Sequence, residues 1–390
     1  MCENDRVDFF VFLYTVYRIY SILSTILTKY LWAALIKTSV HDIIRHRNNR
    51  NGDDIMTRRE TVIRALRHEP TEHIPYHAEF TEQEYRKLTD FIGNPAFSDS
   101  CGGYLHYMQY WGYPAEQEKN SGYFTDDFGV TWNRSGADKD IGVVDCPVIR
   151  EPDISLYPEP YLNEARIREQ CERLLKTKED RFCFAGIGFS MFERLWSYTG
   201  MEDALVYMIS EPEFVHILLD RILAFNLKVI DIFNEYQCDA VYFGDDWGQQ
   251  KGMIMGAPHW RTFIKPRMEV MYRRAKKDGK FIIQHSCGDI SDVLPDLIEI
   301  GLDCYQTVQP EIYDLRHLKE AYGDRLSFWG GISTQRALPL CTPAEIEQIV
   351  RETAAVMSQN GGYILAPTHA VPQDVPPENV LAMIDCFRKM

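Results

Sequence analysis

The feature that most constrains the fold is a regular alternation of short apolar runs and helical patterns between residues 181 and 366. Each run has the length of a buried strand, and a helical segment separates it from the next run. The predicted strands are 182–185, 239–243, 281–283, 302–306, 326–329 and 362–366. Parallel strands need a crossover between them, usually a helix, so this alternation predicts βα units and a parallel sheet.

Two further runs bring the predicted number of strands to eight. One lies at 72–79, and the other lies near residue 130 in an irregular region rich in Gly, Pro, Tyr and Asp. Over residues 56–390 this pattern predicts an α/β fold, a closed (β/α)8 TIM barrel. A doubly wound open sheet is the alternative. The chain has no Gly-x-Gly-x-x-Gly turn after a first strand and no Walker loop, which disfavours nucleotide-binding forms of that alternative.

Residues 1–55 differ from the rest of the chain. From residue 9 to 36 they are almost continuously apolar and aromatic, broken by Arg18 and Lys29. The stretch is long enough to cross a bilayer, although a central charge costs about 2.5–3.5 kcal/mol. Met56 resembles the first residue of the folded protein, because Thr57 and Glu60 form the capping pattern of a helix N-terminus directly after it. We therefore predict a hydrophobic N-terminal extension (1–55) and a barrel domain (56–390). The extension is an artefact of an upstream start site, a membrane anchor or a partner-binding helix.

The charge and the cysteines narrow the class of protein. A net charge of −15 argues against nucleic acid or anionic lipid as the main partner. The 10 cysteines are scattered, without the spacing of a disulfide framework. This usage suits a reducing cytoplasm, and the predicted location is cytoplasmic, with membrane association only through residues 9–36.

Polar side chains with chemical potential follow the C-terminal ends of separate predicted strands. In a parallel barrel those ends meet on one face, where active sites lie. Taken singly, each has a structural explanation, such as capping a helix or satisfying a loop backbone. Their coincidence favours a site built from Asp245 and Asp246, His285 and Cys287, Gln309, and His369.

Three of these residues form a predicted zinc site. His285, Cys287 and His369 offer three nitrogen and sulfur ligands and leave a fourth position for an aspartate, water or substrate. That pattern is typical of catalytic rather than structural zinc. Asp245 and Asp246 are the predicted catalytic residues, and the predicted substrate-binding residues are Gln309, Trp247, Tyr305 and Trp329.

Several motifs together resemble one known family. They are Gly244-Asp245-Asp246 with Lys265-Pro266-Arg267, His285-Ser286-Cys287-Gly288, Phe328-Trp329-Gly330-Gly331-Ile332, 361–367 and Pro376-Pro377-Glu378-Asn379. Residues 56–390 resemble the uroporphyrinogen decarboxylase superfamily, and more closely its corrinoid-linked branch, the methylcobamide:coenzyme M methyltransferases. The resemblance implies a barrel, a methyltransferase activity, Zn²⁺, and a corrinoid carried on a separate protein.

The chain departs from the family pattern in two places. The Arg-rich stretch with which uroporphyrinogen decarboxylases hold substrate carboxylates is not found. The methyltransferases have a later cysteine as third ligand, where this chain has His369. One thiolate and two neutral imidazoles would leave Zn²⁺ with a net charge of about +1, which suits a Lewis acid that polarises an ether oxygen.

The predicted function is therefore a zinc-dependent methyltransferase. It would move a methyl group between a small O- or N-methylated compound, or a thiol acceptor, and a corrinoid protein. The alternative is a metal-free carboxy-lyase of the uroporphyrinogen decarboxylase type, in which His369 and an aspartate handle protons. A third reading is a non-enzymatic binding protein anchored through residues 9–36.

Overall fold

The computed structural model describes residues 56–97, 101–113, 122–135 and 142–390. The predictions for residues 1–55 lie outside these described residues. The compact body comprises residues 56–88 and 101–390. Among the described segments, no helix combines the length and apolarity needed to cross a membrane.

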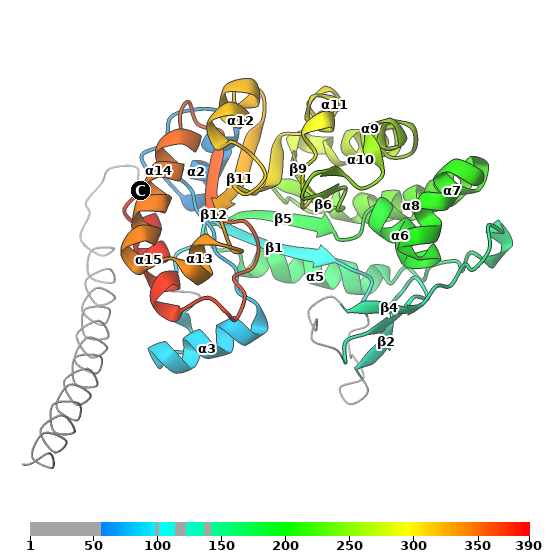
Figure 1. Cartoon of the computed structure of the whole chain (residues 1–390), viewed down its shortest axis with the longest axis horizontal. Helices are drawn as coiled ribbons and strands as arrows, with labels where there is room; N and C mark the ends of the chain where they lie inside the picture. The colour runs from blue at the N-terminus through cyan, green and yellow to red at the C-terminus, as the bar shows by residue number, and fades with distance from the viewer. Residues whose placement is uncertain (1–55, 98–100, 114–121, 136–141) are drawn as a thin grey trace, which may run out of the picture. The chain divides into compact units, whose positions relative to one another are not determined.

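The body is built around a curled sheet of seven parallel strands in the order β1-β5-β6-β9-β10-β11-β12 (Figure 1). The strands are β1 (Leu105–Tyr110), β5 (Phe182–Ile187), β6 (Ala240–Gly244), β9 (Phe281–His285), β10 (Cys304–Val308), β11 (Ser327–Ile332) and β12 (Tyr363–Pro367). The register places His285 beside Gly244 on one side and beside Gln306 on the other. All six strands predicted after residue 181 are confirmed, within a few residues at their ends.

The predicted strand at 72–79 is reduced to a short pairing segment between the two edges of this sheet. The amide of His77 donates to the carbonyl of Leu365 in β12 (3.0 Å), and Leu365 donates to Pro75 (2.9 Å). On the other side, the amide of Tyr104, next to β1, donates to the carbonyl of Tyr76 (2.9 Å). The segment thus takes the place of an eighth strand, which is consistent with a TIM barrel.

The prediction of a barrel strand near residue 130 is wrong. Thr131–Asn133 forms β3 of a separate antiparallel sheet with β2 (Tyr123–Thr125) and β4 (Val143–Cys146). The missing barrel strand is β1, whose sequence LHYMQY lacks the apolar run of the other strands. Its central residues are only half-buried, so the hydrophobic pattern gave no signal for it.

Helices lie between the strands and cover the outside of the sheet (Figure 1). In the described part of the chain the first helix is α2, which starts after Thr57, whose hydroxyl accepts a hydrogen bond from the amide of Glu60 (3.1 Å), as predicted. The helices are α2 (Arg58–Leu66), α3 (Glu82–Ile92), α5 (Glu164–Thr177), α6 (Phe192–Thr199), α7 (Met201–Ser210), α8 (Pro212–Phe233), α9 (Gly256–His259), α10 (Lys265–Ala275), α11 (Leu294–Glu299), α12 (Leu315–Tyr322), α13 (Ala337–Leu340), α14 (Pro343–Met357) and α15 (Pro377–Phe387).

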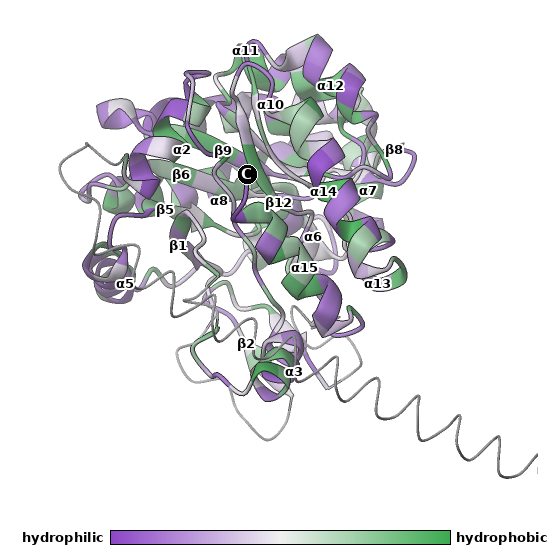
Figure 2. Ribbon diagram, turned by 90° about the vertical axis from the view of Figure 1, so that its left-hand side faces the viewer, coloured by the Kyte–Doolittle hydropathy of each residue, from purple (hydrophilic) through white to green (hydrophobic). Residues whose placement is uncertain are grey.

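The interior of the curled sheet is apolar and strongly aromatic. Figure 2 shows hydrophobic residues on the central strands and hydrophilic ones on outer helices such as α5 and α12. The side chains that meet inside include Phe182 and Phe184 of β5, Tyr242 of β6 and Trp329 of β11. Such rings bury large areas, and this layer supports the strand ends from which the polar side chains project.

Candidate metal centre

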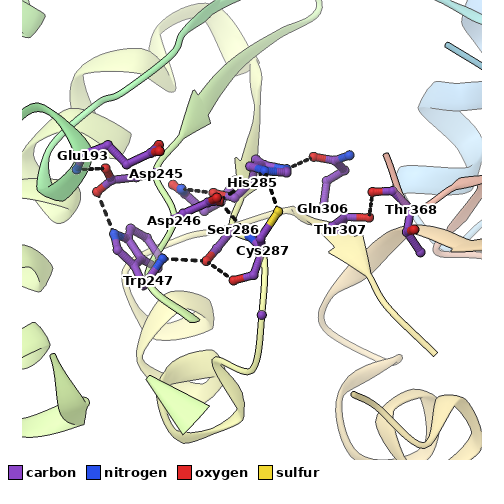
Figure 3. A network of polar contacts seen from close by, with 12 residues as sticks. Glu193, Asp245, Asp246, Trp247, His285, Ser286, Cys287, Gln306, Thr307 and Thr368 are labelled. Atoms are coloured by element: carbon purple, nitrogen blue, oxygen red, sulfur yellow. Dashed lines mark hydrogen bonds and ion pairs between the residues drawn. The ribbon is translucent and has the colours of Figure 1, made fainter. Parts of the chain in front are cut away.

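Asp246, His285 and Cys287 converge at the C-terminal ends of β6 and β9 (Figure 3). Nε2 of His285 lies 3.3 Å from Oδ1 of Asp246 and 3.5 Å from Sγ of Cys287. The backbone amide of Cys287 also donates to Oδ1 of Asp246 (2.8 Å), which fixes the loop after β9 against the loop after β6. Oxygen, nitrogen and sulfur donors thus point toward a common position.

The separations of these atoms fit a tetrahedral zinc ion. With Zn–N near 2.0–2.1 Å, Zn–S near 2.3 Å and Zn–O near 2.0–2.2 Å, tetrahedral angles place the nitrogen about 3.4 Å from the oxygen and about 3.5 Å from the sulfur. The structure has 3.3 and 3.5 Å for these two separations. The donor set therefore fits Zn²⁺ in both chemistry and spacing, with one coordination position left for a further ligand.

Gln306, on the neighbouring strand β10, orients the imidazole of His285. Its Oε1 accepts a hydrogen bond from Nδ1 of His285 and another from the hydroxyl of Tyr242 (3.3 Å). An amide oxygen can only accept, so Nδ1 carries a proton, and Nε2, which faces Asp246 and Cys287, is the nitrogen that would bind a metal after losing any proton of its own. Metal-binding histidines are commonly held by such a partner on the other ring nitrogen.

The neighbouring charges shift the pKa values of the site. Burial alone would raise the pKa of Asp246, but the hydrogen bond and charge of His285 outweigh it and hold that pKa below its usual value. Burial would likewise lower the pKa of His285, but Tyr242, Cys287 and Asp246 raise it well above its ordinary value. Asp246 is therefore ionised at neutral pH, as a metal-binding carboxylate must be.

Asp245 faces away from the metal donors and caps helix α6. Both carboxylate oxygens are occupied by four donors, which are the backbone amides of Met191 (3.2 Å), Phe192 (2.9 Å) and Glu193 (2.8 Å) and Nε1 of Trp247 (2.6 Å). The residue is fully buried, and burial raises its pKa to about 6 against the opposing effect of the donors. This geometry favours a positioning role over the predicted catalytic one.

His369 lies in the loop after β12, as predicted, but farther from the other donors. Its ring centroid is 6.2 Å from that of His285, and its side chain is exposed. Among the described residues, the group of donor atoms close enough to share one ion contains Asp246 and not His369. The structure therefore brings together two of the three predicted ligands, with Asp246 in the third place.

Three of the four predicted substrate-binding residues brace a loop of the site or pack in the core. Oε1 of Gln309 accepts from the amide of Gly288 (2.7 Å), and the hydroxyl of Tyr305 donates to the carbonyl of Ser286 (3.0 Å), so both brace the loop that carries Cys287. Trp247 is fully buried against Trp260, with ring centroids 5.3 Å apart. Trp329 alone of the four lies among the aromatic residues inside the sheet.

Two acidic residues at the site were not predicted. The surrounding protein raises the pKa of Glu79 above its usual value by reducing its hydration, while the charge of His285 opposes this shift and the exposure of the residue limits it. Glu193 is buried beside Asp246 and Asp245, and burial together with these charges raises its pKa well above the usual range. A signal existed for Glu79, which ends the 72–79 run. Glu193 sits inside a helix, and nothing in the sequence distinguished it.

Comparisons with known proteins agree on the family. The uroporphyrinogen decarboxylase (URO-D) family matches residues 133–390, more than half of the chain. A methylated-thiol--coenzyme M methyltransferase of Methanosarcina mazei is 24% identical over 185 residues, covering 47% of each chain. A uroporphyrinogen decarboxylase of Pectobacterium carotovorum is 21% identical over 185 residues, covering 47% of this chain and 50% of its own. The chain thus spans about half the length of the curated relatives it matches.

A solved structure extends the likeness to most of the fold. A methyltransferase from Methanosarcina mazei superposes with a TM-score of 0.65 at 17% identity, covering 86% of this chain and 99% of its own. At this identity the likeness concerns the fold alone. Together with the family match, it leads to one conclusion: the chain belongs to the uroporphyrinogen decarboxylase family.

Proposed function

We propose that this protein is a zinc-dependent methyltransferase that moves a methyl group between a small methylated compound and a corrinoid protein. The observation that carries the proposal is the spacing of Asp246, His285 and Cys287, in which the two separations from Nε2 of His285 match two edges of a zinc tetrahedron. The relative named as a methyltransferase supports the reaction class. Bound zinc would supply a Lewis acid for the heteroatom that carries the methyl group, or a place to hold a thiolate.

The protein's own residues position and tune this centre. Gln306 accepts from Nδ1 of His285 and so holds the ring with Nε2 facing Asp246 and Cys287. Asp245 fixes the start of α6, and Trp247 and Ser286 tie the loops after β6 and β9 together through a hydrogen bond from the Trp247 amide to the Ser286 hydroxyl (2.9 Å). His369, whose ring centroid lies 6.2 Å from that of His285, would contact a ligand bound in the remaining coordination position.

Asp246 changes the charge expected for the centre. A thiolate and a carboxylate together carry two negative charges, so zinc with Asp246, His285 and Cys287 has a net charge of about zero, not +1. This is the charge that two thiolates would give. The centre's own charge therefore does not favour an ether over a thiol, and the preference must come from the surrounding residues.

Metal analysis of purified full-length protein tests the proposal. We expect one zinc per chain, lost on Cys287→Ala or His285→Ala and reduced on Asp246→Asn. Cys341→Ser and Asp289→Asn are the matched controls, because these half-buried residues lie outside the donor group. His369→Ala decides whether that residue also binds the ion.

A methyl-transfer assay separates this function from its alternative. The zinc-loaded protein is mixed with a reduced corrinoid protein and candidate methyl donors, and formation of the methylated corrinoid is followed by absorbance. A protein without zinc that decarboxylates a tetrapyrrole would instead be a carboxy-lyase, the activity that the decarboxylase relatives' names indicate. Finding that activity would end the methyltransferase proposal.

A further inference from the structure

A row of inward-facing positions crosses the sheet beside the metal centre. Gly244 of β6 pairs with His285 of β9, and a β-carbon added to Gly244 would lie 3.6 Å from the Cα of Gly188, directly after β5. The register of β1 with β5, continued by one residue, places Trp111 beside Gly188. Strand residues alternate between faces, and Tyr242 belongs to the interior, so Gly244 also faces inward. Two glycines therefore separate Trp111 from His285 on the inside of the sheet.

The first of these glycines, Gly188, is covered by the indole of Trp111. A β-carbon on Gly188 would collide with three adjacent atoms of the six-membered ring of Trp111, all at nearly the same distance. Nearly equal distances to adjacent ring atoms place Gly188 over the face of the ring. The indole therefore lies flat on Gly188, on the inner side of the sheet, and the residue is only half-buried.

The second glycine, Gly244, has room for a side chain. A β-carbon there would lie 3.6–3.7 Å from its three nearest atoms, which is ordinary van der Waals contact. Its backbone φ is also not among the positive values found in the described chain. Within those residues, neither a neighbour nor the backbone conformation calls for glycine at this position. A glycine inside a strand often marks a place where a ligand approaches the backbone closely.

The space over Gly244 is reached by solvent and bounded by rings. On its two sides, 13% of the His285 side chain is exposed and Trp111 is only half-buried. Tyr242 lies below it, with Cε1 3.6 Å from the β-carbon position of Gly244 and its ring centroid 6.3 Å from that of His285. The backbones of Gly188 and His285 are two strand spacings, about 10 Å, apart, so the space is narrow. We call this space, bounded by Trp111, Tyr242 and His285, the Gly244 slot.

The walls of the Gly244 slot favour a flat, aromatic ligand. Aromatic rings pack against one another edge-to-face or offset, and Trp111, Tyr242 and His285 offer rings on three sides. A saturated ring of the same size is thicker and has no π-system to pair with them. A small aliphatic methyl donor would reach the metal centre but would make little contact with the rings.

We propose that the Gly244 slot binds the ring of an aryl methyl ether, with the ether oxygen directed toward the metal centre. This inference rests on the proposed function and names its substrate class. In the transfer, the bond between the methyl carbon and the ether oxygen breaks, and its electron pair stays on the oxygen. The product leaves as a phenolate and takes a proton from solvent. The electron pair of the new bond to the methyl carbon comes from the reduced corrinoid of the partner protein, so no other reductant or oxidant is needed.

Calorimetric titration of the full-length, zinc-loaded protein with two ethers tests the inference. Methoxybenzene has a flat aromatic ring, and methoxycyclohexane carries the same methoxy group on a saturated ring with the same number of carbons. We expect methoxybenzene to bind at least about tenfold more tightly than methoxycyclohexane. Equal affinity for the two ethers, or tighter binding of methoxycyclohexane, would overturn the proposal.

Variants test the walls of the slot one residue at a time. Gly244→Ala places a methyl group in the slot without a clash, and it should weaken methoxybenzene binding about tenfold or more while zinc content stays at one per chain. Trp111→Leu should weaken binding likewise, and Trp111→Phe, which keeps a ring, should stay within about threefold of the wild type. Tyr161→Leu is the control, because this tyrosine is 68% exposed, and it should leave the affinity unchanged.

The zinc content of each variant decides how its affinity is interpreted. Unchanged methoxybenzene affinity in zinc-loaded Gly244→Ala contradicts the proposal. If Gly244→Ala loses zinc, the two Trp111 variants decide, and equal affinities of Trp111→Leu and Trp111→Phe contradict a ring-binding role for this residue.

The outcomes also separate this inference from the proposed function. The titration needs no corrinoid protein. If neither ether binds while the protein holds zinc and methylates a corrinoid from another donor, the substrate class is wrong and the methyltransferase assignment stands. If the protein holds no zinc and transfers no methyl group, the proposed function itself fails.

Discussion

Replacing Asp245 with asparagine should destabilise the protein without removing its metal ligands. The carboxylate accepts from three backbone amides at the start of α6 and from Nε1 of Trp247, and none of its surface is exposed. Asparagine retains one acceptor oxygen and turns an NH2 group toward two of these four donors. Each hydrogen bond to a charged group contributes about 1.5–3 kcal/mol. Since a neutral amide costs less to bury, we expect a net loss of about 3 kcal/mol.

Urea unfolding followed by circular dichroism measures this loss, with protein prepared in a chelator so that zinc binding does not contribute. Asp246→Asn is the contrasting variant, because Asp246 is partly exposed and accepts from only one backbone amide. It should cost less than about 1 kcal/mol in chelator. It should nevertheless weaken zinc binding more than Asp245→Asn does. If Asp245→Asn unfolds within about 0.5 kcal/mol of the wild type, the capping account of this residue is wrong.

Three further predictions concern other parts of the structure. Gln306→Ala should weaken zinc binding about 10–100-fold, measured by competition with a chelating dye, because His285 loses the partner that orients its ring; unchanged affinity would contradict that role. Asp126→Asn should lower the free energy of unfolding, measured by thermal denaturation, by about 3–5 kcal/mol, because it leaves Arg194 buried without the carboxylate that lies 2.9 Å away. Asp145→Asn, on β4, is the control and should have little effect. Burial lowers the pKa of Lys319 from 10.5 to about 8, so between these pH values the unfolded chain binds more protons than the folded chain. As pH rises from 8 to 10.5, the free energy of unfolding of the wild type should therefore increase by up to about 3 kcal/mol relative to that of Lys319→Met. A difference that does not change with pH would contradict the lowered pKa.

The sequence could predict the strands that are buried on both faces. Phe182–Ile187 and Tyr363–Pro367 are fully buried, so their apolar runs carried the signal for a parallel sheet. Leu105–Tyr110 has four half-buried residues in its centre, and its pattern did not distinguish it from a loop. Thr131–Asn133 has strand-forming residues but pairs antiparallel outside the main sheet. Pairing partners depend on the tertiary fold, which local pattern does not encode.

The candidate site, too, could be predicted only where it depends on local sequence and not on pairing between distant segments. His285 and Cys287 are two residues apart at a strand end, so sequence spacing alone placed them together. The choice between Asp246 and His369 as the next donor depends on how two loops from different strands approach each other. Asp246 is brought in because the amide of Cys287 donates to its carboxylate, a contact across 41 residues of sequence. The role of Gln306 likewise comes from the register between β9 and β10.

The proposed metal centre contains zinc with one sulfur ligand, and Asp246 joins His285 and Cys287 in binding it. X-ray absorption spectroscopy at the zinc edge of the full-length protein tests it most directly. We expect one sulfur at about 2.3 Å and the remaining ligands as nitrogen or oxygen at about 2.0–2.2 Å, with the sulfur lost in Cys287→Ala. Two sulfur ligands, or a zinc signal unchanged by Cys287→Ala, would contradict it.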